Sequence, residues 1–438
     1  MTKCAQLAGT LRKWSNLSSW QIDLLDMSAP TPTLDCIRGL GVKRLLRVSI
    51  AVGMGIIVAI PGRGQNATAG GSRRSAALSL EQQGRLSDAE AAWQALAKSN
   101  PSDSEALAHL GLLEAREEHY KEAVPYYRKA LALNPRMPGL RMNLGLAYFK
   151  GGDLRLAVST FQPLLQAAPK DSAEAERLTT LIGLADYGLG AYADAVPHLK
   201  QAIATDPQNL PFRMMLVHAC LWSKQYQCVL DIYHEIITLN AESAEADMLA
   251  GEAYDEMKNE AGAIEQFQAA IKADPKAQDA HFGYGYLLWR KAKYEEAENE
   301  FRTELANNPD QPLALTYLAD AEIRFGHFSE AAPLLEHAIR IQSSIELAYV
   351  DLGTAYQGEG RDDDALREFK EAEQRDPTDP TVHWRLGKLY RAMGRRVEAN
   401  AELDKTQGLL AKRNESLREQ MNQVEFKSIV QNADHKAN

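Results

Sequence analysis

The feature that most constrains this chain is a pattern that recurs about every 34 residues. One copy runs from Ser104 to Pro135 and consists of two short helical patterns joined by a polar turn. The successive copies begin at Gly70, Ser104, Pro138, Glu176, Leu210, Ala244, Gln278, Pro312, Glu346 and Pro380. Only the step from Pro138 to Glu176 is longer, by four residues, and we expect this excess, near residues 170–174, to lengthen a loop or a helix end. A period of this length predicts an array whose units bury their apolar faces against one another.

Three columns of the repeat explain how one unit folds. The eighth and twentieth positions are almost always Gly or Ala, as at Gly145 and Ala157. Two helix backbones approach each other at these positions, and a larger side chain would force them apart. The twenty-fourth position carries a large apolar residue in every unit: Trp93, Tyr127, Phe161, Leu199, Tyr233, Phe267, Phe301, Leu335, Phe369 and Leu403. Prolines such as Pro135 then end the second helix. Each unit is therefore predicted to be a helix hairpin.

These columns resemble the tetratricopeptide repeat family, from Gly70 to about Ala411. The resemblance implies an all-α, right-handed solenoid of about ten helix hairpins. The other helical fold to consider is one long coiled coil, and the regularly spaced glycines and prolines exclude it. After Leu403 the apolar residues Leu410, Leu417 and Val424 recur every seven positions. They predict a C-terminal capping helix that covers the last repeat face. This helix and a frayed tail make up residues 412–438. A dimerising coiled coil is the alternative.

The unit that begins at Leu210 departs from the pattern. Val217 and Val229 replace the small residues of the two close-approach columns, and Ala241 replaces the closing proline. We therefore expect this hairpin to be slightly splayed. A hinge or ligand notch is one interpretation, and sequence drift in a tolerant array is the other.

The residues before the array have the layout of a secretory signal peptide. A basic stretch at residues 43–47 precedes the apolar run Val48–Ile60, a Pro-Gly pair follows, and Ala67 and Ala69 form an Ala-x-Ala triplet. We therefore predict a signal peptide over residues 42–69 with cleavage before Gly70, and a periplasmic or secreted array in a bacterial cell envelope. An uncleaved inner-membrane anchor is the alternative, although a run of thirteen residues is short for a membrane span.

Residues 1–41 are unusual ahead of a signal peptide, which rarely carries so long an extension. We interpret them as a non-native or disordered N-terminal extension. The expected true start is later, at Met27 or at a non-ATG codon for Val42.

Only two of the four cysteines, Cys220 and Cys228, lie in the array. They occupy the eleventh and nineteenth positions of their unit, one on each helix and about equally far from the turn between them. A disulfide is one expectation for an oxidising compartment, and two separate buried thiols are the other.

Several classes of function are disfavoured by the sequence. There is no phosphate-binding loop, no His-Glu-x-x-His pattern and no Gly-x-Ser-x-Gly elbow. The ten histidines lack metal-ligand spacing. Residues 1–69 carry eight Lys or Arg and three Asp, so with a total of −10 the remainder carries a net charge of −15. Such an acidic array repels nucleic acids. We therefore expect no catalytic residues, no cofactor, no metal and no nucleic-acid partner.

The family resemblance implies a concave groove lined by the second, fifth, ninth, twelfth and thirteenth positions of each first helix. The predicted partner-binding residues are Phe149, Tyr187, Trp222, Phe282, Tyr286 and Trp289. They are accompanied by Met142, Leu146, Leu184, Met214, His218, Leu221 and Met248. Both ends of the groove are more polar, with Arg116, Arg324, Lys388 and Arg391. The alternative is that some of these aromatic side chains only pack between helices.

The predicted function is that of a non-catalytic scaffold that binds a protein or peptide segment in its groove, outside the inner membrane and without membrane insertion after cleavage. Relatives that bind terminal carboxylates use Lys and Asn on successive helices, but only Asn143 matches here, so that use is disfavoured. The alternatives are a binding subunit of carbohydrate-polymer or cell-wall assembly and export, or an accessory subunit of an enzyme such as a glycosyltransferase. A monomer is favoured.

Overall fold

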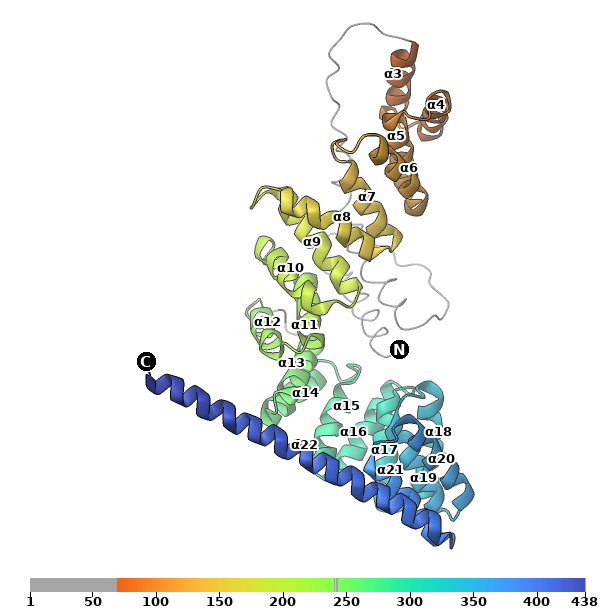
Figure 1. Ribbon diagram of the computed structural model, residues 1–438, viewed down its shortest axis with the longest axis vertical. Helices are drawn as coiled ribbons and strands as arrows, with labels where there is room; N and C mark the ends of the chain where they lie inside the picture. The colour runs from red at the N-terminus through yellow and green to blue at the C-terminus, as the bar shows by residue number, and fades with distance from the viewer. Residues whose placement is uncertain (1–68, 240, 242, 438) are drawn as a thin grey trace. The chain divides into compact units, whose positions relative to one another are not determined.

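The computed structural model describes residues 69–239, 241 and 243–437, so the predicted extension and all but the last residue of the predicted signal peptide lie outside the described residues. All regular elements in the described part are helices, joined in consecutive hairpins (Figure 1). The prediction of an all-α array of ten hairpins is confirmed. The chain divides into two compact units, Met1–Glu242 and Ser243–Asn438.

The described part of the first unit contains five hairpins. Its helices are α3 (Ala69–Gln82), α4 (Leu86–Ser99), α5 (Ser104–Arg116), α6 (Tyr120–Leu133), α7 (Leu140–Gly151), α8 (Leu154–Ala167), α9 (Ala173–Gly188), α10 (Tyr192–Thr205), α11 (Leu210–Trp222) and α12 (Tyr226–Thr238). The core of each hairpin lies between its two helices, where Trp93, Tyr127 and Phe161 are among the largest fully buried side chains.

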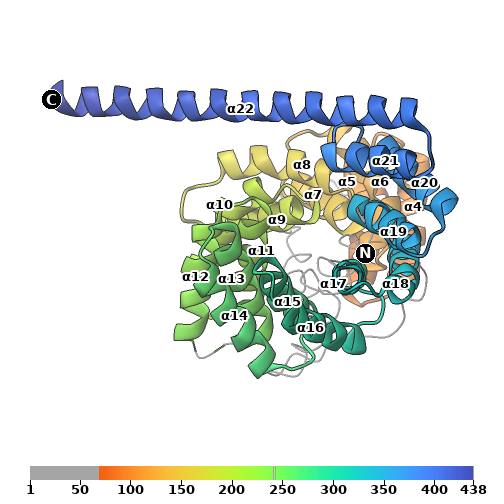
Figure 2. The ribbon, with the colours of Figure 1, turned by 90° about the horizontal axis from the view of Figure 1, so that it is seen from below.

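The second unit contains the other five. Its helices are α13 (Ala244–Glu256), α14 (Glu260–Ala273), α15 (Ala280–Arg290), α16 (Tyr294–Asn307), α17 (Pro312–Phe325), α18 (Phe328–Ile341), α19 (Glu346–Gly358), α20 (Asp362–Arg375), α21 (Pro380–Ala392) and α22 (Arg396–Ala437). In Figure 2 the first helices α15, α17 and α19 lie toward one side of this unit, and the second helices α16 and α18 lie toward the other. We call the side of the first helices the inner side.

The small-residue columns act as expected. A Cβ atom added to Gly145 would lie 2.3 Å from Cε1 of Phe161, and one added to Gly353 would lie 2.6 Å from Cδ1 of Phe369. Real Cβ atoms do not approach a ring so closely, so either helix would have to shift. The ring of the twenty-fourth position therefore packs directly over the glycine of the eighth.

The four-residue excess forms an extra first turn of α9. This helix begins at Ala173, three residues before the register position Glu176. The backbone N–H of Ala175 donates to the Ser172 Oγ at 3.1 Å, which caps the helix. The insertion therefore lengthens a helix end, one of the two outcomes expected.

The hairpin from Leu210 is the loosest in the described chain, because α11 and α12 contact each other less extensively than the helices of any other hairpin. Val217 and Val229 are nonetheless buried at the crossing. The structure contains a disulfide between Cys220 of α11 and Cys228 of α12, whose Cα atoms lie 5.9 Å apart. A covalent link thus joins the two helices whose packing is least extensive.

The long helix α22 serves first as the second helix of the last hairpin. Ala399, Glu402 and Thr406 are buried on its α21 side. The side chains of residues 411–416 are exposed, and the three buried residues lie before them. Among the described residues, we find no helix with both the length and the apolar character that a bilayer span requires.

Candidate aromatic binding surface

Four partly exposed aromatic rings gather on the inner side of the second unit. We call Phe282, Tyr286, Trp289 and Tyr317 the aromatic cluster. The first three come from α15 and the fourth comes from α17. The Tyr317 ring centroid lies 4.9 Å from that of Trp289 and 5.2 Å from that of Tyr286, in edge-to-face arrangements. The Tyr286 and Trp289 rings are 6.1 Å apart and nearly parallel. Such geometries are favourable for aromatic pairs, so the cluster is held by its own contacts.

Charged groups fix the orientation of the Trp289 ring. Its Nε1 donates a hydrogen bond of 2.5 Å to Oδ2 of Asp320. The Nε of Arg324 donates to the same oxygen at 2.6 Å, and its guanidinium lies 5.5 Å from the Trp289 ring centroid. The indole is therefore anchored at one edge while part of its surface faces solvent.

A buried carboxyl group lies beside this assembly. Asp351 of α19 is 6% exposed, and its Oδ2 has no hydrogen-bond partner among the described residues. Burial raises the pKa of the Asp351 carboxyl well above its usual range, and Asp320 raises it further, whereas Arg385 and Arg324 act in the opposite direction. Burial also raises the pKa of the Tyr317 hydroxyl, to about 12. The Asp351 carboxyl is therefore strongly desolvated, and the Tyr317 hydroxyl is partly so.

In the last hairpin, the first helix α21 carries two cationic residues at repeat positions that are aromatic in α15. Trp384, Lys388 and Arg391 of α21 occupy the fifth, ninth and twelfth positions, which are held by Phe282, Tyr286 and Trp289 on α15. All three are exposed, Trp384 by 40%. The Lys388 Nζ lies 4.5 Å from the Trp384 ring centroid. We call these three residues the basic strip.

The predicted groove residues of the first unit are placed differently. Phe149 is 1% exposed and packs against Phe161, with ring centroids 6.5 Å apart. Tyr187 is 3% exposed and lies 5.6 Å from Tyr192 and 6.1 Å from Trp222. Both side chains are buried among other rings, as in the alternative that some of these aromatic residues pack between helices. Their role in binding a partner stays a prediction.

Of the remaining predicted residues, Trp222 is partly exposed and packs 4.5 Å from Tyr192. The structure brings Phe282, Tyr286 and Trp289 together as expected. Their role in binding a partner stays a prediction.

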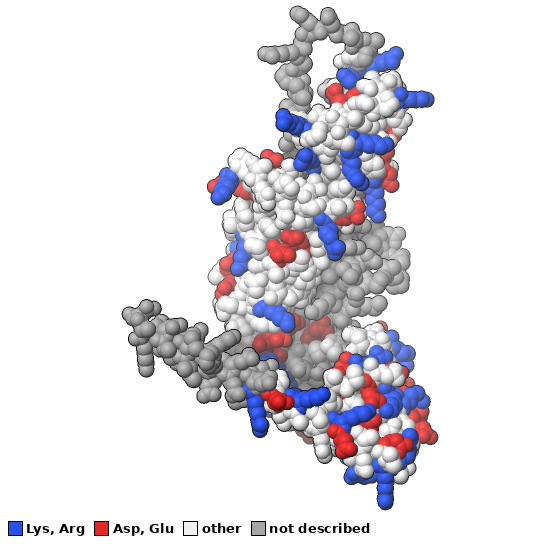
Figure 3. All heavy atoms as spheres, viewed as in Figure 1, with Lys and Arg blue, Asp and Glu red and all other residues white. Residues whose placement is uncertain are grey.

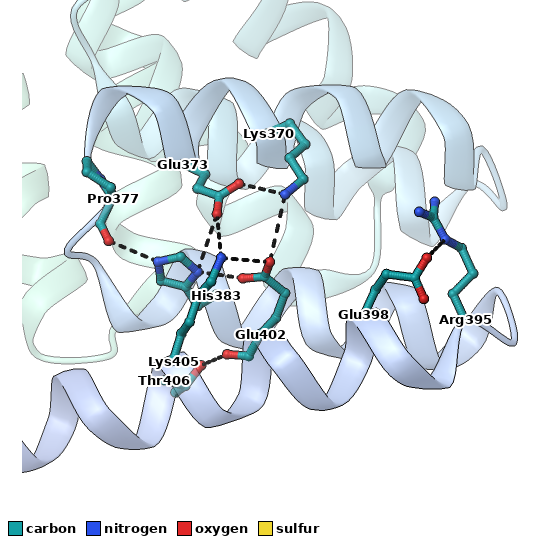
Figure 4. A network of polar contacts seen from close by, with 9 residues as sticks. All are labelled: Lys370, Glu373, Pro377, His383, Arg395, Glu398, Glu402, Lys405 and Thr406. Carbon is teal, nitrogen blue, oxygen red and sulfur yellow. Dashed lines mark hydrogen bonds and ion pairs between the residues drawn. The ribbon is translucent and has the colours of Figure 1, made fainter.

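A second polar assembly, which sequence reasoning missed, joins α20, α21 and α22 (Figure 4). Ligand atoms of Glu373, His383 and Glu402 lie within 4.8 Å of one another, close enough to hold a metal ion. His383 contacts Glu402 through Nδ1 at 2.7 Å and the Pro377 carbonyl through Nε2 at 3.0 Å.

Two lysines already neutralise these carboxylates. The Lys370 Nζ lies 2.6 Å from Glu373, and the Lys405 Nζ lies 3.0 Å from Glu402 and 3.1 Å from Glu373. A metal ion would have to displace both ammonium groups. We therefore interpret the assembly as an ion-pair network that closes the last hairpin.

A spacing in the sequence could have revealed this network. His383 and Glu402 are 19 residues apart, and so are His281 and Glu300. His281 contacts Glu300 at 2.6 Å and the Pro275 carbonyl at 3.2 Å, so the same contacts recur three units earlier. Recurrence in a second hairpin favours a structural role for both histidines.

The chain is similar to segments of larger curated proteins. It is 19% identical over 273 residues to anaphase-promoting complex subunit 3 of Schizosaccharomyces pombe. The aligned region covers 62% of this chain and 40% of that protein. It is 24% identical over 237 residues to the human protein O-mannosyl-transferase TMTC1, which covers 53% of this chain and 26% of the relative. The chain therefore matches less than half of the length of either relative.

Among solved structures, YrrB, described as a tetratricopeptide repeat protein with an unusual peptide-binding site, is 21% identical. The match has a TM-score of 0.37 and covers 43% of this chain and 97% of YrrB.

The family assignment rests on matches along almost the whole array. One family model of the tetratricopeptide repeat matches residues 74–138, 231–278, 248–312, 285–344 and 350–407. A second tetratricopeptide repeat model matches residues 114–182 and 187–250. These matches cover more than half of the chain and agree with the ten hairpins of the fold. The chain belongs to the tetratricopeptide repeat family.

Proposed function

We propose that this chain is a non-catalytic scaffold that binds a protein or peptide segment on the inner side of its second unit. The aromatic cluster carries the proposal, because it places four rings on adjacent first helices and leaves each partly exposed. Aromatic side chains dominate the energy of many protein interfaces, and a ring already fixed by its neighbours loses little conformational entropy on binding. Trp289 is such a ring, because Asp320 and Arg324 hold it.

A selection from a random peptide display library tests this proposal. The full chain is the bait, and a Tyr286→Ala, Trp289→Ala chain is the comparison. We expect the first to enrich peptides with apolar or aromatic anchors and the second to lose that enrichment. Leu156→Ala on α8 is the control, because it removes an apolar side chain that is 49% exposed in the other unit. Equal enrichment by all three chains would contradict the proposal.

We also propose that the array acts outside the inner membrane, after removal of a signal peptide. Support comes from the basic stretch at residues 43–47, the apolar run Val48–Ile60 and the small residues Ala67 and Ala69. N-terminal sequencing of the protein from envelope fractions should begin at or near Gly70. Substitution Ala69→Tyr should leave a larger, membrane-held precursor. An intact chain in the cytoplasm, with residues 48–60 retained, would refute export.

A second candidate is a role in glycan assembly, with a glycosyltransferase or a glycan as the bound partner. The similarity to an O-mannosyl-transferase favours it, and exposed aromatic rings can stack on sugar rings. Binding of the wild-type chain on a glycan array, lost on Trp289→Ala and without enrichment of any peptide, would replace the peptide proposal with this one.

A further inference from the structure

We propose that the segment bound by the second unit is acidic at one end: an apolar side chain sits on the aromatic cluster, and carboxylates bind the basic strip. The inference rests on the proposed function and specifies the chemistry of its partner. The partner is an extended segment of another protein, because the two surfaces lie on different first helices of one continuous stack.

The first reason is that the two surfaces use the same repeat positions. Phe282, Tyr286 and Trp289 on α15 correspond to Trp384, Lys388 and Arg391 on α21. The first helices between them make a continuous path, because α15 contacts α17, α17 contacts α19, and α19 contacts α21. A segment that crosses these helices on their inner side would meet the aromatic rings first and the cations afterwards.

The second reason is charge. Neither Lys388 nor Arg391 forms an ion pair in the described part of the chain, although the whole chain carries a net charge of −10. Two cations three residues apart on a helix repel each other and destabilise it. At the adjacent helix α22, by contrast, the cations are paired: Arg395, just before the helix, binds Glu398 at 3.0 Å, and Lys405 within it binds Glu402 at 3.0 Å. Figure 3 shows positive and negative side chains intermingled over the visible face of the second unit. The basic strip is thus a local surplus of positive charge.

The third reason is that arginines already lie near the carboxyl groups between the two surfaces. Asp320 is bound by Arg324 and by Trp289. Asp351 lies within the electrostatic reach of Arg385, which is partly buried. A cationic segment would therefore meet Arg324 of α17 in the middle of the path, and Arg385, Lys388 and Arg391 of α21 at its end. An acidic end is the complementary choice.

The geometry also sets the spacing within the partner. Successive packed helices are about 8–10 Å apart, so three steps from α15 to α21 span about 24–30 Å. An extended chain advances about 3.3 Å per residue, so the apolar anchor and the carboxylates should be about seven to nine residues apart.

The test uses full-length chains and a display library of random peptides of about fifteen residues, long enough for that spacing. One chain is wild type, and the second carries Lys388→Glu with Arg391→Glu. The control carries Lys412→Glu with Arg413→Glu, which changes the net charge equally at exposed positions of α22. Enriched peptides are then synthesised with amidated C-termini, and their affinities are measured by fluorescence anisotropy at low and high salt.

We expect the wild type and the control to enrich peptides with Asp or Glu about seven to nine residues from an apolar residue. The reversed chain should lose this bias and gain one for Lys or Arg. Replacing the two acids of an enriched peptide by amides should weaken its binding to the wild type about three- to tenfold, and high salt should erase the difference. The amidated termini exclude recognition of a terminal carboxylate.

Two results would overturn the inference. If enriched peptides depend on Trp289 but show no acidic bias, the acidic partner is refuted while the peptide-binding function stands. If no peptide is enriched and the wild type instead binds an anionic polysaccharide such as alginate through Lys388 and Arg391, both proposals fail and the basic strip serves a glycan.

Discussion

The twelfth repeat position shows how differently the two units use the same column. Phe149 and Trp289 both occupy it, on α7 of the first unit and α15 of the second. Phe149 is 1% exposed and packs against Phe161 of its own hairpin. Trp289 is partly exposed, and its polar edge is bound by Asp320. A column position thus sets the side of the helix on which a residue lies, and its neighbours decide whether it is core or surface.

This difference separates stability from binding. In the first unit the aromatic residue contributes mainly to the free energy of folding. In the second unit a polar group and an edge-to-face neighbour, Tyr317, hold the ring in place while leaving surface available. Substitution of Phe149 should therefore mainly lower the free energy of unfolding, whereas substitution of Trp289 should mainly weaken the binding of a partner.

The largest effect on stability is expected for Phe149→Ala. Removing a fully buried phenyl ring costs about 3–5 kcal/mol. Trp289→Ala should lower the free energy of unfolding by clearly less, because part of the indole is already solvated. Urea unfolding followed by circular dichroism measures both. A larger decrease in the free energy of unfolding for Trp289→Ala than for Phe149→Ala would contradict this difference between the two units.

The next largest effect concerns the disulfide of the first unit. Replacing Cys220 and Cys228 together by Ser should destabilise α11 and α12 by about 2–3 kcal/mol, the value expected for a short closed loop. Proteolysis under native conditions should then begin in this hairpin. Unchanged resistance, together with free thiols detected by mass spectrometry in the purified wild-type protein, would favour two separate thiols.

A smaller effect distinguishes a loose hairpin from a tight one. Ala263→Leu adds three heavy atoms at the well-packed crossing of α13 and α14 and should cost about 1–3 kcal/mol. Val229→Leu adds one heavy atom to the hairpin with the least extensive contact and should cost less. Equal shifts of the thermal midpoint would contradict the splayed geometry of the Leu210 unit.

The smallest effect involves the pH dependence of the second unit. The pKa of Asp351 is raised in the folded chain, so folding favours its protonated form. The stability associated with the protonated carboxyl is fully present below the unfolded pKa of about 3.9 and is lost as pH rises through the folded pKa. Asp351→Asn should therefore weaken the decline of stability above pH 4. Parallel pH profiles of the thermal midpoint for the two chains would refute the assignment.

Much of the fold could be predicted from the sequence because the columns report on packing within one hairpin. The contact of Gly145 with Phe161 follows from positions eight and twenty-four alone. The extra turn before Glu176 and the loose packing around Val217 also follow from departures from the columns.

The candidate surface could be predicted only in part, because exposure depends on contacts that one column does not contain. Phe149 and Tyr187 were assigned to the groove by position, but rings from other positions cover them. Tyr317 occupies the sixth position, outside the five columns of the expected groove, and was therefore missed. The carboxylate of Asp320, which orients Trp289, comes from the next hairpin along the chain.

The most direct test of the central claim compares the two units in one experiment. Amide hydrogen exchange is measured by mass spectrometry on the full chain, with and without an enriched peptide at a concentration that saturates binding. The account predicts slower exchange in α15, α17 and α21, and little change in α5 to α9. Protection confined to α7, α9 and α11, with α15 and α17 unaffected, would contradict it.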